Sequence, residues 1–388
     1  MEQMTEISQK MYDRAQGIQT VDQAVALLRD CGDFRTLGDI LRSVFGPDQT
    51  KKAIVDGLCV NHPEASRDSV DRKVRNWLNG RTQSVSKTDA FELALMAGLS
   101  LEAADLFLKQ VTGEGIHWRN VEDVLWSYAL YHQYSYVQTQ DFIARCSNLI
   151  SSCKQIKTER SQVYTAEIEQ KIRPVLRGSE SDLISFLKNQ STSFGSAHNT
   201  AYSLFQQYME ILENGGTGDY IDDGPKMTAR YILENYLYRE IIPVVKRDKS
   251  RGQSAFDVIQ RTIRANWPDE QTLSRMKSRE IEVPRKVLMM LFLATDGGDE
   301  DSWSGDTDDF DDYDDEPLSR DELFQDVSTR MNKMLHSCGF QELDPRNPFD
   351  WIVLFSICVD DLWDADARIK SVLENLFPDG NENQNLAD

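Results

Sequence analysis

Six polar side chains between residues 72 and 87 have the types and the spacing of a nucleic-acid contact. They are Arg72, Lys73, Arg75, Asn76, Arg81 and Lys87. Arginine and lysine donate hydrogen bonds to guanine edges or to phosphates, and asparagine pairs with adenine in a major groove. Arg72, Lys73 and Asn76 are predicted to face base edges. Arg75, Arg81 and Lys87 are predicted to lie on phosphates, which position a protein without specifying sequence.

A short helix over residues 69–79 must position most of these side chains. Its apolar residues recur at i, i+4 and i+7, the spacing of a single helix face, and they are Val70, Val74 and Trp77. Ser69 is the expected N-cap, and Gly80 is expected to stop the helix. The polar side chains then fall on the remaining face. The sequence therefore predicts a helix that is buried on one side and basic on the other.

Two more helices are expected after this one, and one before it. The downstream helices run over residues 87–97 and 101–110, with a tight turn at Gly98 between them and Ser100 as the second N-cap. The upstream helix runs over residues 37–44. These helices have the spacing of a helix-turn-helix core.

This pattern resembles the later helices of the lambda-repressor-like (Cro-type) helix-turn-helix domain. Within residues 69–108, the matching positions are Val74, Trp77, Leu78, Asn79, Gly80, Ala94, Leu95, Gly98, Leu99 and Ser100. The resemblance implies a DNA-binding unit. The stretch over residues 48–68 departs from the domain, because it is longer than a tight second helix and turn require and contains the helix-breaking pair His62-Pro63. The whole chain also resembles uncharacterised helical proteins of Firmicutes-type bacteria, and that resemblance implies no activity.

The same residues fit a second interpretation, in which no nucleic acid is bound. Basic helices with an apolar stripe are common on protein surfaces. The alternative function is therefore a helical protein–protein interaction scaffold, whose partner is another protein or a second copy of the chain. A more distant alternative is a metal-dependent hydrolase. Its carboxylates would be Asp360, Asp361, Asp364 and Asp366.

Charge is unevenly distributed along the chain of 388 residues. The net charge of −21 argues against a protein whose whole surface grips nucleic acid or an anionic membrane. However, residues 296–316 hold 12 acidic residues and no basic one, whereas residues 51–90 hold 8 basic and 5 acidic residues. We therefore expect an acidic flexible linker over residues 296–318 and a locally basic segment around the predicted helix.

Motifs of the common enzyme and membrane classes are absent from the sequence. There is no G-x-x-x-x-G-K-[ST] phosphate loop, no pair of histidines at i, i+3 or i, i+4, and no apolar run that could cross a bilayer. Six cysteines without a C-x-x-C pair, together with a polar N-terminus, indicate reduced thiols in the cytoplasm. We expect a non-enzymatic protein with no catalytic residue, metal site, cofactor or membrane contact.

A five-residue pattern, Arg-Asn-x-x-Asp, occurs twice, each time before an apolar helix. The two copies are Arg119-Asn120-Val121-Glu122-Asp123 and Arg346-Asn347-Pro348-Phe349-Asp350. We interpret each asparagine as an N-cap and each aspartate as its partner in a capping box. A paired recognition element is the alternative interpretation. One short match does not establish a duplication.

Helical periodicity dominates the chain and predicts an all-α protein made of multi-helix bundle units. Six segments are expected: an N-terminal helical arm (1–33), a helix-turn-helix-like unit (34–112), a central helical domain (113–295), the acidic flexible linker (296–318), a C-terminal helical unit (319–378) and a polar tail (379–388). The sequence thus favours a non-enzymatic, cytoplasmic bacterial regulatory or adaptor protein. Its expected partner is DNA, bound through residues 69–81.

Overall fold

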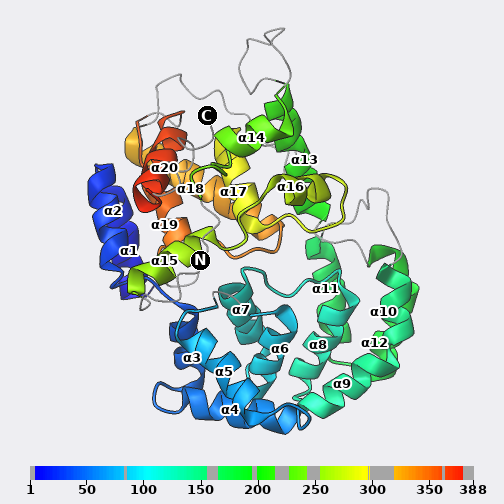
Figure 1. Ribbon diagram of the computed structural model, residues 1–388. Coiled ribbons are helices and arrows are strands. Elements are labelled where there is room, and N and C mark those ends of the chain that lie inside the picture. Colours follow the sequence, from blue (N-terminus) through cyan, green and yellow to red (C-terminus); the bar gives the residue numbers. More distant parts are fainter. Residues whose placement is uncertain are drawn as a thin grey trace. The chain divides into compact units, whose positions relative to one another are not determined.

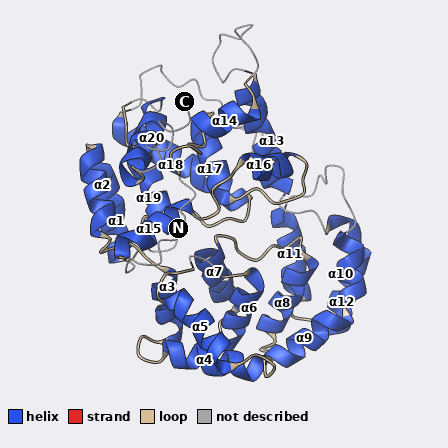
Figure 2. Ribbon diagram, viewed as in Figure 1, coloured by secondary structure: helices blue, strands red, loops and turns tan. Residues whose placement is uncertain are grey.

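A computed structural model of the protein describes most of the chain. The described residues are 5–82, 85–154, 165–194, 199–214, 227–242, 254–295, 297, 319–360 and 363–378. Within these ranges the chain forms twenty α-helices and no β-strand (Figure 2). The predicted all-α fold is therefore confirmed. The acidic linker, apart from Gly297, and the polar tail lie outside the described residues.

The helices divide between two compact units. Unit 1 combines Met1–Arg35, Ala201–Leu335 and Glu342–Asp388. Unit 2 combines Thr36–Thr200 with His336–Gln341, and within it Glu114 and Phe340 form an isolated antiparallel bridge. The division into six segments stays a prediction, and its central domain (113–295) includes residues of both units.

Unit 2 contains the helices of the predicted helix-turn-helix-like region and those that follow it (Figure 1). They are α3 (Leu37–Phe45), α4 (Thr50–Asn61), α5 (Arg67–Leu78), α6 (Lys87–Met96), α7 (Leu101–Thr112), α8 (Val121–Tyr131), α9 (Tyr136–Arg145), α10 (Ser147–Lys154), α11 (Thr165–Val175) and α12 (Glu180–Asn189), followed by a 3-10 turn (Ser191–Ser193). A continuous hydrophobic core joins α3 to α12. Within this core, the rings of Phe91 on α6 and Trp126 on α8 stack with their centroids 5.4 Å apart.

Local signals in the sequence set the ends of the helices around α5. α4 ends at Asn61, shortly before Pro63, which has no N–H to continue a helix. Ser66 caps α5, because its hydroxyl accepts a hydrogen bond from the backbone N–H of Ser69. The predicted cap at Ser69 is therefore wrong, and the helix begins two residues earlier than expected. The predicted cap at Ser100, which begins α7, is confirmed.

Unit 1 contains the remaining helices. They are α1 (Glu6–Gly17), α2 (Val21–Asp30), α13 (Asn199–Glu213), α14 (Ala229–Asn235), α15 (Ala255–Arg264), α16 (Glu270–Lys277), α17 (Arg285–Ala294), α18 (Arg320–Ser337), α19 (Pro348–Ser356) and α20 (Trp363–Leu376). α19 is buried along its whole length and packs against α1, α15 and α20. The Trp351 indole donates a hydrogen bond of 3.0 Å to the carbonyl of Met11, which ties α1 to α19.

The two Arg-Asn-x-x-Asp patterns form helix starts, but not capping boxes. Asn120 caps α8 and Asn347 caps α19, as predicted. Asp123 and Asp350 do not bond back to these asparagines. Asp123 accepts from the backbone N–H of His117, and Asp350 accepts from that of Asp344. The capping-box prediction is wrong because both carboxylates bind groups outside their own first turn.

No helix in the described ranges is long and apolar enough to cross a membrane.

Candidate nucleic-acid interface

α5 is anchored in unit 2 by one face. Val70, Val74 and Trp77 are 7%, 0% and 3% exposed, so the burial predicted from their spacing is confirmed. These side chains belong to the core of the unit, where α5 packs against α3 and α4. The helix ends at Leu78, and Gly80, the predicted stop, follows two residues later in a left-handed conformation with φ of 62°. Because this face is buried in the core, the opposite face of α5 points outward.

The outward face of α5 carries most of the predicted contact residues. Arg72, Lys73 and Arg75 are exposed, and Asn76 is half-buried. Arg81, also exposed, follows directly after the turn at Gly80. This turn is closed by the carbonyl of Asn76, which accepts from the backbone N–H of Arg81 at 2.9 Å. The structure therefore brings these five residues to one helix face and the turn that follows it.

Two of the exposed cations already have protein partners. The Lys73 ammonium lies 2.6 Å from the carboxylate of Asp89 and over the ring of Trp77. Arg75 lies 2.7 Å from Asp71, whose other oxygen lies 2.7 Å from Lys51. The hydrogen bond from Lys51 and the charges of Lys51 and Arg75 lower the pKa of Asp71. These are surface ion pairs, which are individually weak, so a phosphate could compete with the carboxylates for the same cations.

Arg72 and Arg81 differ from these pairs. Among the described residues, neither guanidinium has an ion pair or a hydrogen bond. An exposed guanidinium presents five N–H donors in a planar fork that matches a phosphate or a guanine edge. These two arginines are therefore the cations most available to an external anion on this face.

Lys87, the sixth predicted contact residue, binds a buried carboxylate instead. It is the first residue of α6, and its ammonium lies 2.6 Å from the carboxylate of Asp123. The side chain of Asp123 is only 6% exposed, and its burial raises the pKa of that carboxyl. Removing a cation from a buried carboxylate is costly. This placement favours a structural role for Lys87 over the predicted phosphate contact.

A buried carboxylate fixes the connection between α4 and α5. Glu92 on α6 is 1% exposed and accepts from the side-chain amide of Asn61 at 2.8 Å. Its other oxygen lies 3.0 Å from Nε2 of His62. Asn61 is the last residue of α4 and His62 follows it, so Glu92 holds the turn that leads into α5. Sequence reasoning missed this anchor, because Glu92 lies far along the chain from Asn61 and His62.

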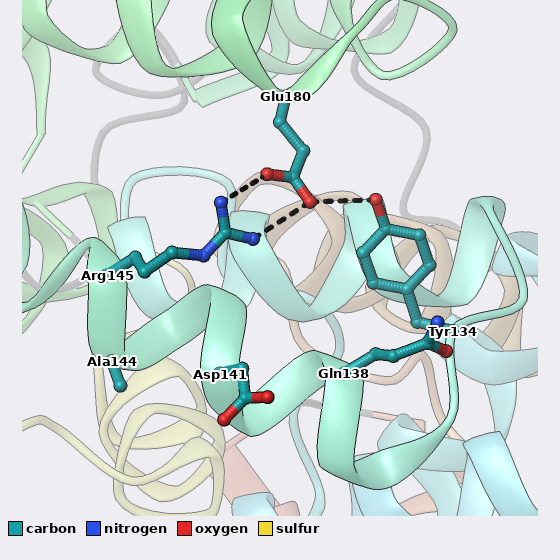
Figure 3. Close-up of a pocket in the computed structure, with 6 residues that line it drawn as sticks. All are labelled: Tyr134, Gln138, Asp141, Ala144, Arg145 and Glu180. Carbon is teal, nitrogen blue, oxygen red and sulfur yellow. Dashed lines mark hydrogen bonds and ion pairs between the residues drawn. The ribbon is translucent and has the colours of Figure 1, made fainter.

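A cavity of about 770 Å³ in unit 2 is the second candidate site (Figure 3). It is lined by Tyr134, Gln138, Asp141, Ala144, Arg145 and Glu180. Arg145 and the hydroxyl of Tyr134 both bind Glu180, at 2.7 and 2.9 Å. Burial, with the hydrogen bond to Glu180, raises the pKa of Tyr134 to about 12, and the hydrogen bond from Arg145 lowers that of Glu180.

The polar groups of this cavity satisfy one another. Both oxygens of Glu180 are held, and Tyr134 keeps its proton at neutral pH. The arrangement therefore supports a structural polar cluster between α9 and α12 better than an acid–base pair. The sequence carries no signal for it, since Arg145 and Glu180 are widely separated in the chain.

The aspartates of the hydrolase interpretation lie in unit 1. Asp360 and Asp364 line a cavity of about 410 Å³ together with Arg320 and Arg368. Asp366 instead accepts a hydrogen bond from the hydroxyl of Tyr238, and Asp361 lies outside the described residues. In the part of the chain that the structure describes, no three His, Cys, Asp or Glu side chains are grouped to hold a metal ion.

No protein-family model, no curated protein and no solved structure matches this chain.

Proposed function

We propose that this is a non-enzymatic bacterial regulatory or adaptor protein of the cytoplasm that binds double-stranded DNA through α5 and the turn after it. The observation that carries the proposal is the pair Arg72 and Arg81. They stand exposed, without a protein partner among the described residues, on a helix whose other face is fixed in the core. A helix of this kind can enter a major groove without deforming the unit that carries it.

Each side chain of the interface has a distinct role in this proposal. Arg72 reads a base edge, and the half-buried Asn76 assists it near the end of the helix. Arg81 lies on a phosphate. Arg75 and Lys51 exchange their shared carboxylate, Asp71, for phosphate when DNA binds. The acidic balance of the rest of the chain confines binding to this surface.

Selection from random duplex DNA at two salt concentrations, followed by a mobility-shift titration, tests the proposal. The double variant Arg72→Ala/Arg81→Ala should weaken binding by about tenfold or more and reduce the salt dependence, because each lost phosphate contact lowers the salt slope by about one. Lys171→Ala/Arg177→Ala is the matched control, since it removes two exposed cations on and after α11. An equal loss of DNA affinity in the two double variants would mean that the protein attracts DNA only through non-specific charge, and not through α5.

A protein-interaction scaffold is the second candidate function. Two apolar side chains favour it, since Val60 on α4 is 77% exposed and Val137 on α9 is 60% exposed. Large exposed apolar side chains are frequent at protein interfaces when they form a patch. If selection yields no DNA that the wild-type protein binds, this candidate replaces the first.

A further inference from the structure

We infer that the helical module α3–α9 of unit 2 is present a second time, as α14–α20 of unit 1, and that Arg72 and Arg81 of the first copy have no counterpart in the second. The two Arg-Asn-x-x-Asp patterns lie at the starts of α8 and α19. α9 begins at Tyr136 and α20 at Trp363, at the same distance from the starts of α8 and α19.

The loops before α8 and α19 share one hydrogen-bond pattern. In the first copy, the backbone N–H of Asn120 donates to the carbonyl of His117 at 2.8 Å, and the N–H of His117 donates to Asp123 at 2.8 Å. In the second copy, the N–H of Asn347 donates to the carbonyl of Asp344 at 2.8 Å, and that of Asp344 donates to Asp350 at 2.9 Å. A capping asparagine alone does not require this closed arrangement.

The same loops are also held from the preceding helix by equivalent side chains. Asp105 on α7 accepts from the backbone N–H of Ile116 at 2.7 Å. Asn332 on α18 accepts from that of Leu343 at 2.8 Å. Each pair spans 11 residues of the chain.

A buried ion pair completes the junction in both copies. The cation is the first residue of the fourth helix in each case, Lys87 on α6 and Arg285 on α17. Lys87 lies 2.6 Å from Asp123, and Arg285 binds both oxygens of Asp350 at 2.7 and 2.8 Å. A different cation therefore neutralises the same carboxylate position.

The third helices, α5 and α16, end in the same way. Gly80 and Arg279 follow them in left-handed conformations, with φ of 62° and 58°. The next residue donates its N–H to a carbonyl five positions back, Arg81 to Asn76 at 2.9 Å and Glu280 to Arg275 at 2.8 Å. A left-handed arginine is uncommon, because its Cβ crowds the backbone there. Arg279 occupies the position of Gly80 and has the same left-handed conformation, which indicates that the backbone turn after the third helix is the same in both copies.

The first two helices of each copy, α3 and α4 in the first and α14 and α15 in the second, also share sequence features. Thr36 caps α3 and Thr228 caps α14, and an Ile-Leu pair is buried at the same distance after each threonine. The last residue of α4 begins the sequence Asn-His-Pro (61–63), and the sequence Asn-Trp-Pro (266–268) follows α15. The copies differ in their connections: residues 97–100 join α6 to α7, whereas residues 295–319, which include the acidic segment, join α17 to α18.

The outward face of the third helix differs in charge between the copies. Counted from the left-handed residue that ends each helix, Arg72 corresponds to Gln271, and Arg81 to Glu280. Arg275, an exposed arginine on α16, lies 3.4 Å from Glu280. The second copy has therefore kept the junction and has no counterpart of the two available arginines. The assignment of binding to the first copy alone rests on the proposed function, whereas the duplication does not.

Hydrogen exchange on the full-length protein tests the duplication. Peptides that cover residues 116–117 and 343–344 should both be protected in the wild-type protein, because carboxylate or amide side chains hold these amides. Asp123→Ala should speed exchange at the first pair and Asp350→Ala at the second, whereas Asp141→Ala, an exposed control on α9, should change neither. If residues 343–344 exchange freely in the wild-type protein while residues 116–117 are protected, the duplication is overturned.

A matched pair of arginine variants tests where nucleic acid binds. With a labelled duplex selected from the random DNA pool, at low salt, Arg72→Ala should weaken binding about tenfold, and Arg275→Ala by less than about twofold. Equal weakening by both variants overturns the assignment to the first copy. Absence of binding by the wild-type protein overturns the proposed function, and the exchange experiment still decides the duplication.

Discussion

The ammonium of Lys73 lies 2.6 Å from the carboxylate of Asp89, and this ion pair ties the outward face of α5 to the first turn of α6. The side chains of Lys73 and Asp89 are 46% and 20% exposed, so water and salt screen the attraction between them. Lys73 is thus a cation on the proposed interface that the protein partly neutralises.

Asp89→Asn should therefore strengthen DNA binding. The substitution removes a negative charge next to the interface and releases Lys73 to contact phosphate, which should raise affinity by a few-fold at low salt. Fluorescence anisotropy with duplex DNA measures the change. As a control, Asp89→Asn should raise DNA affinity by less when Lys73 is already replaced by alanine. An equal increase in the wild-type and Lys73→Ala proteins would show that Lys73 is not the cation released.

Trp77→Ala should destabilise unit 2. Its side chain is 3% exposed, and truncation of a large buried aromatic residue costs about 3–5 kcal/mol. Urea unfolding followed by circular dichroism measures the loss. Val60→Ala, at an exposed position of α4, is the control and should change stability by less than about 0.5 kcal/mol. Similar unfolding midpoints for the two variants would mean that α5 is not anchored through Trp77.

Stability should rise with pH above neutrality because of Lys286 in unit 1. Its ammonium donates to the carbonyls of Ile263 and Ala265 at the end of α15, and burial lowers its pKa to about 7. An unfolded lysine has a pKa of about 10.4, so between these values the unfolded chain binds a proton that the folded protein does not. Unfolding is therefore disfavoured progressively as pH increases through this window.

The measurement is guanidinium unfolding at neutral pH and near pH 10. Lys286→Met, which cannot titrate, should show a flatter pH dependence than the wild-type protein. Lys370→Met, at an exposed lysine on α20, serves as the control and should keep the wild-type slope. An unchanged slope in Lys286→Met would refute the account.

Deleting residues 299–316 should raise DNA affinity at low salt. These residues lie outside the described part of the chain, and the expectation comes from charge alone, since they belong to a segment of 12 acidic residues without a basic one. A tethered anion competes with phosphate at a high effective concentration, and salt screens both interactions. The measurement is a DNA titration of the full-length protein and of the protein that lacks residues 299–316, each at low and at high salt. Equal DNA affinities of the two proteins at low salt would contradict the prediction.

The helices could be predicted from the sequence because their signals are local. The spacing of Val70, Val74 and Trp77 marked the buried face of α5, and Ser100 marked the start of α7. The cap of α5 was misplaced because Ser66 and Ser69 both suit a cap, and only the backbone geometry selects Ser66.

The polar partners of the site could not be predicted, because they are set by tertiary packing. Lys87 reads as a surface cation in the sequence, but the fold places it against Asp123. The anchor of Glu92 on the end of α4 and the bidentate pair of Arg285 with Asp350 likewise join different helices. Helical periodicity identifies which face is buried, but not which charged groups meet across a core.

Salt-dependent DNA binding by the wild-type protein and by Arg72→Ala/Arg81→Ala tests the central claim most directly. We expect a linear fall of log affinity with log salt, and a slope smaller by about one in the double variant, because the phosphate contact of Arg81 is lost. We also expect an affinity lower by about tenfold or more at low salt. Identical slopes and affinities for the two proteins would contradict DNA binding through α5.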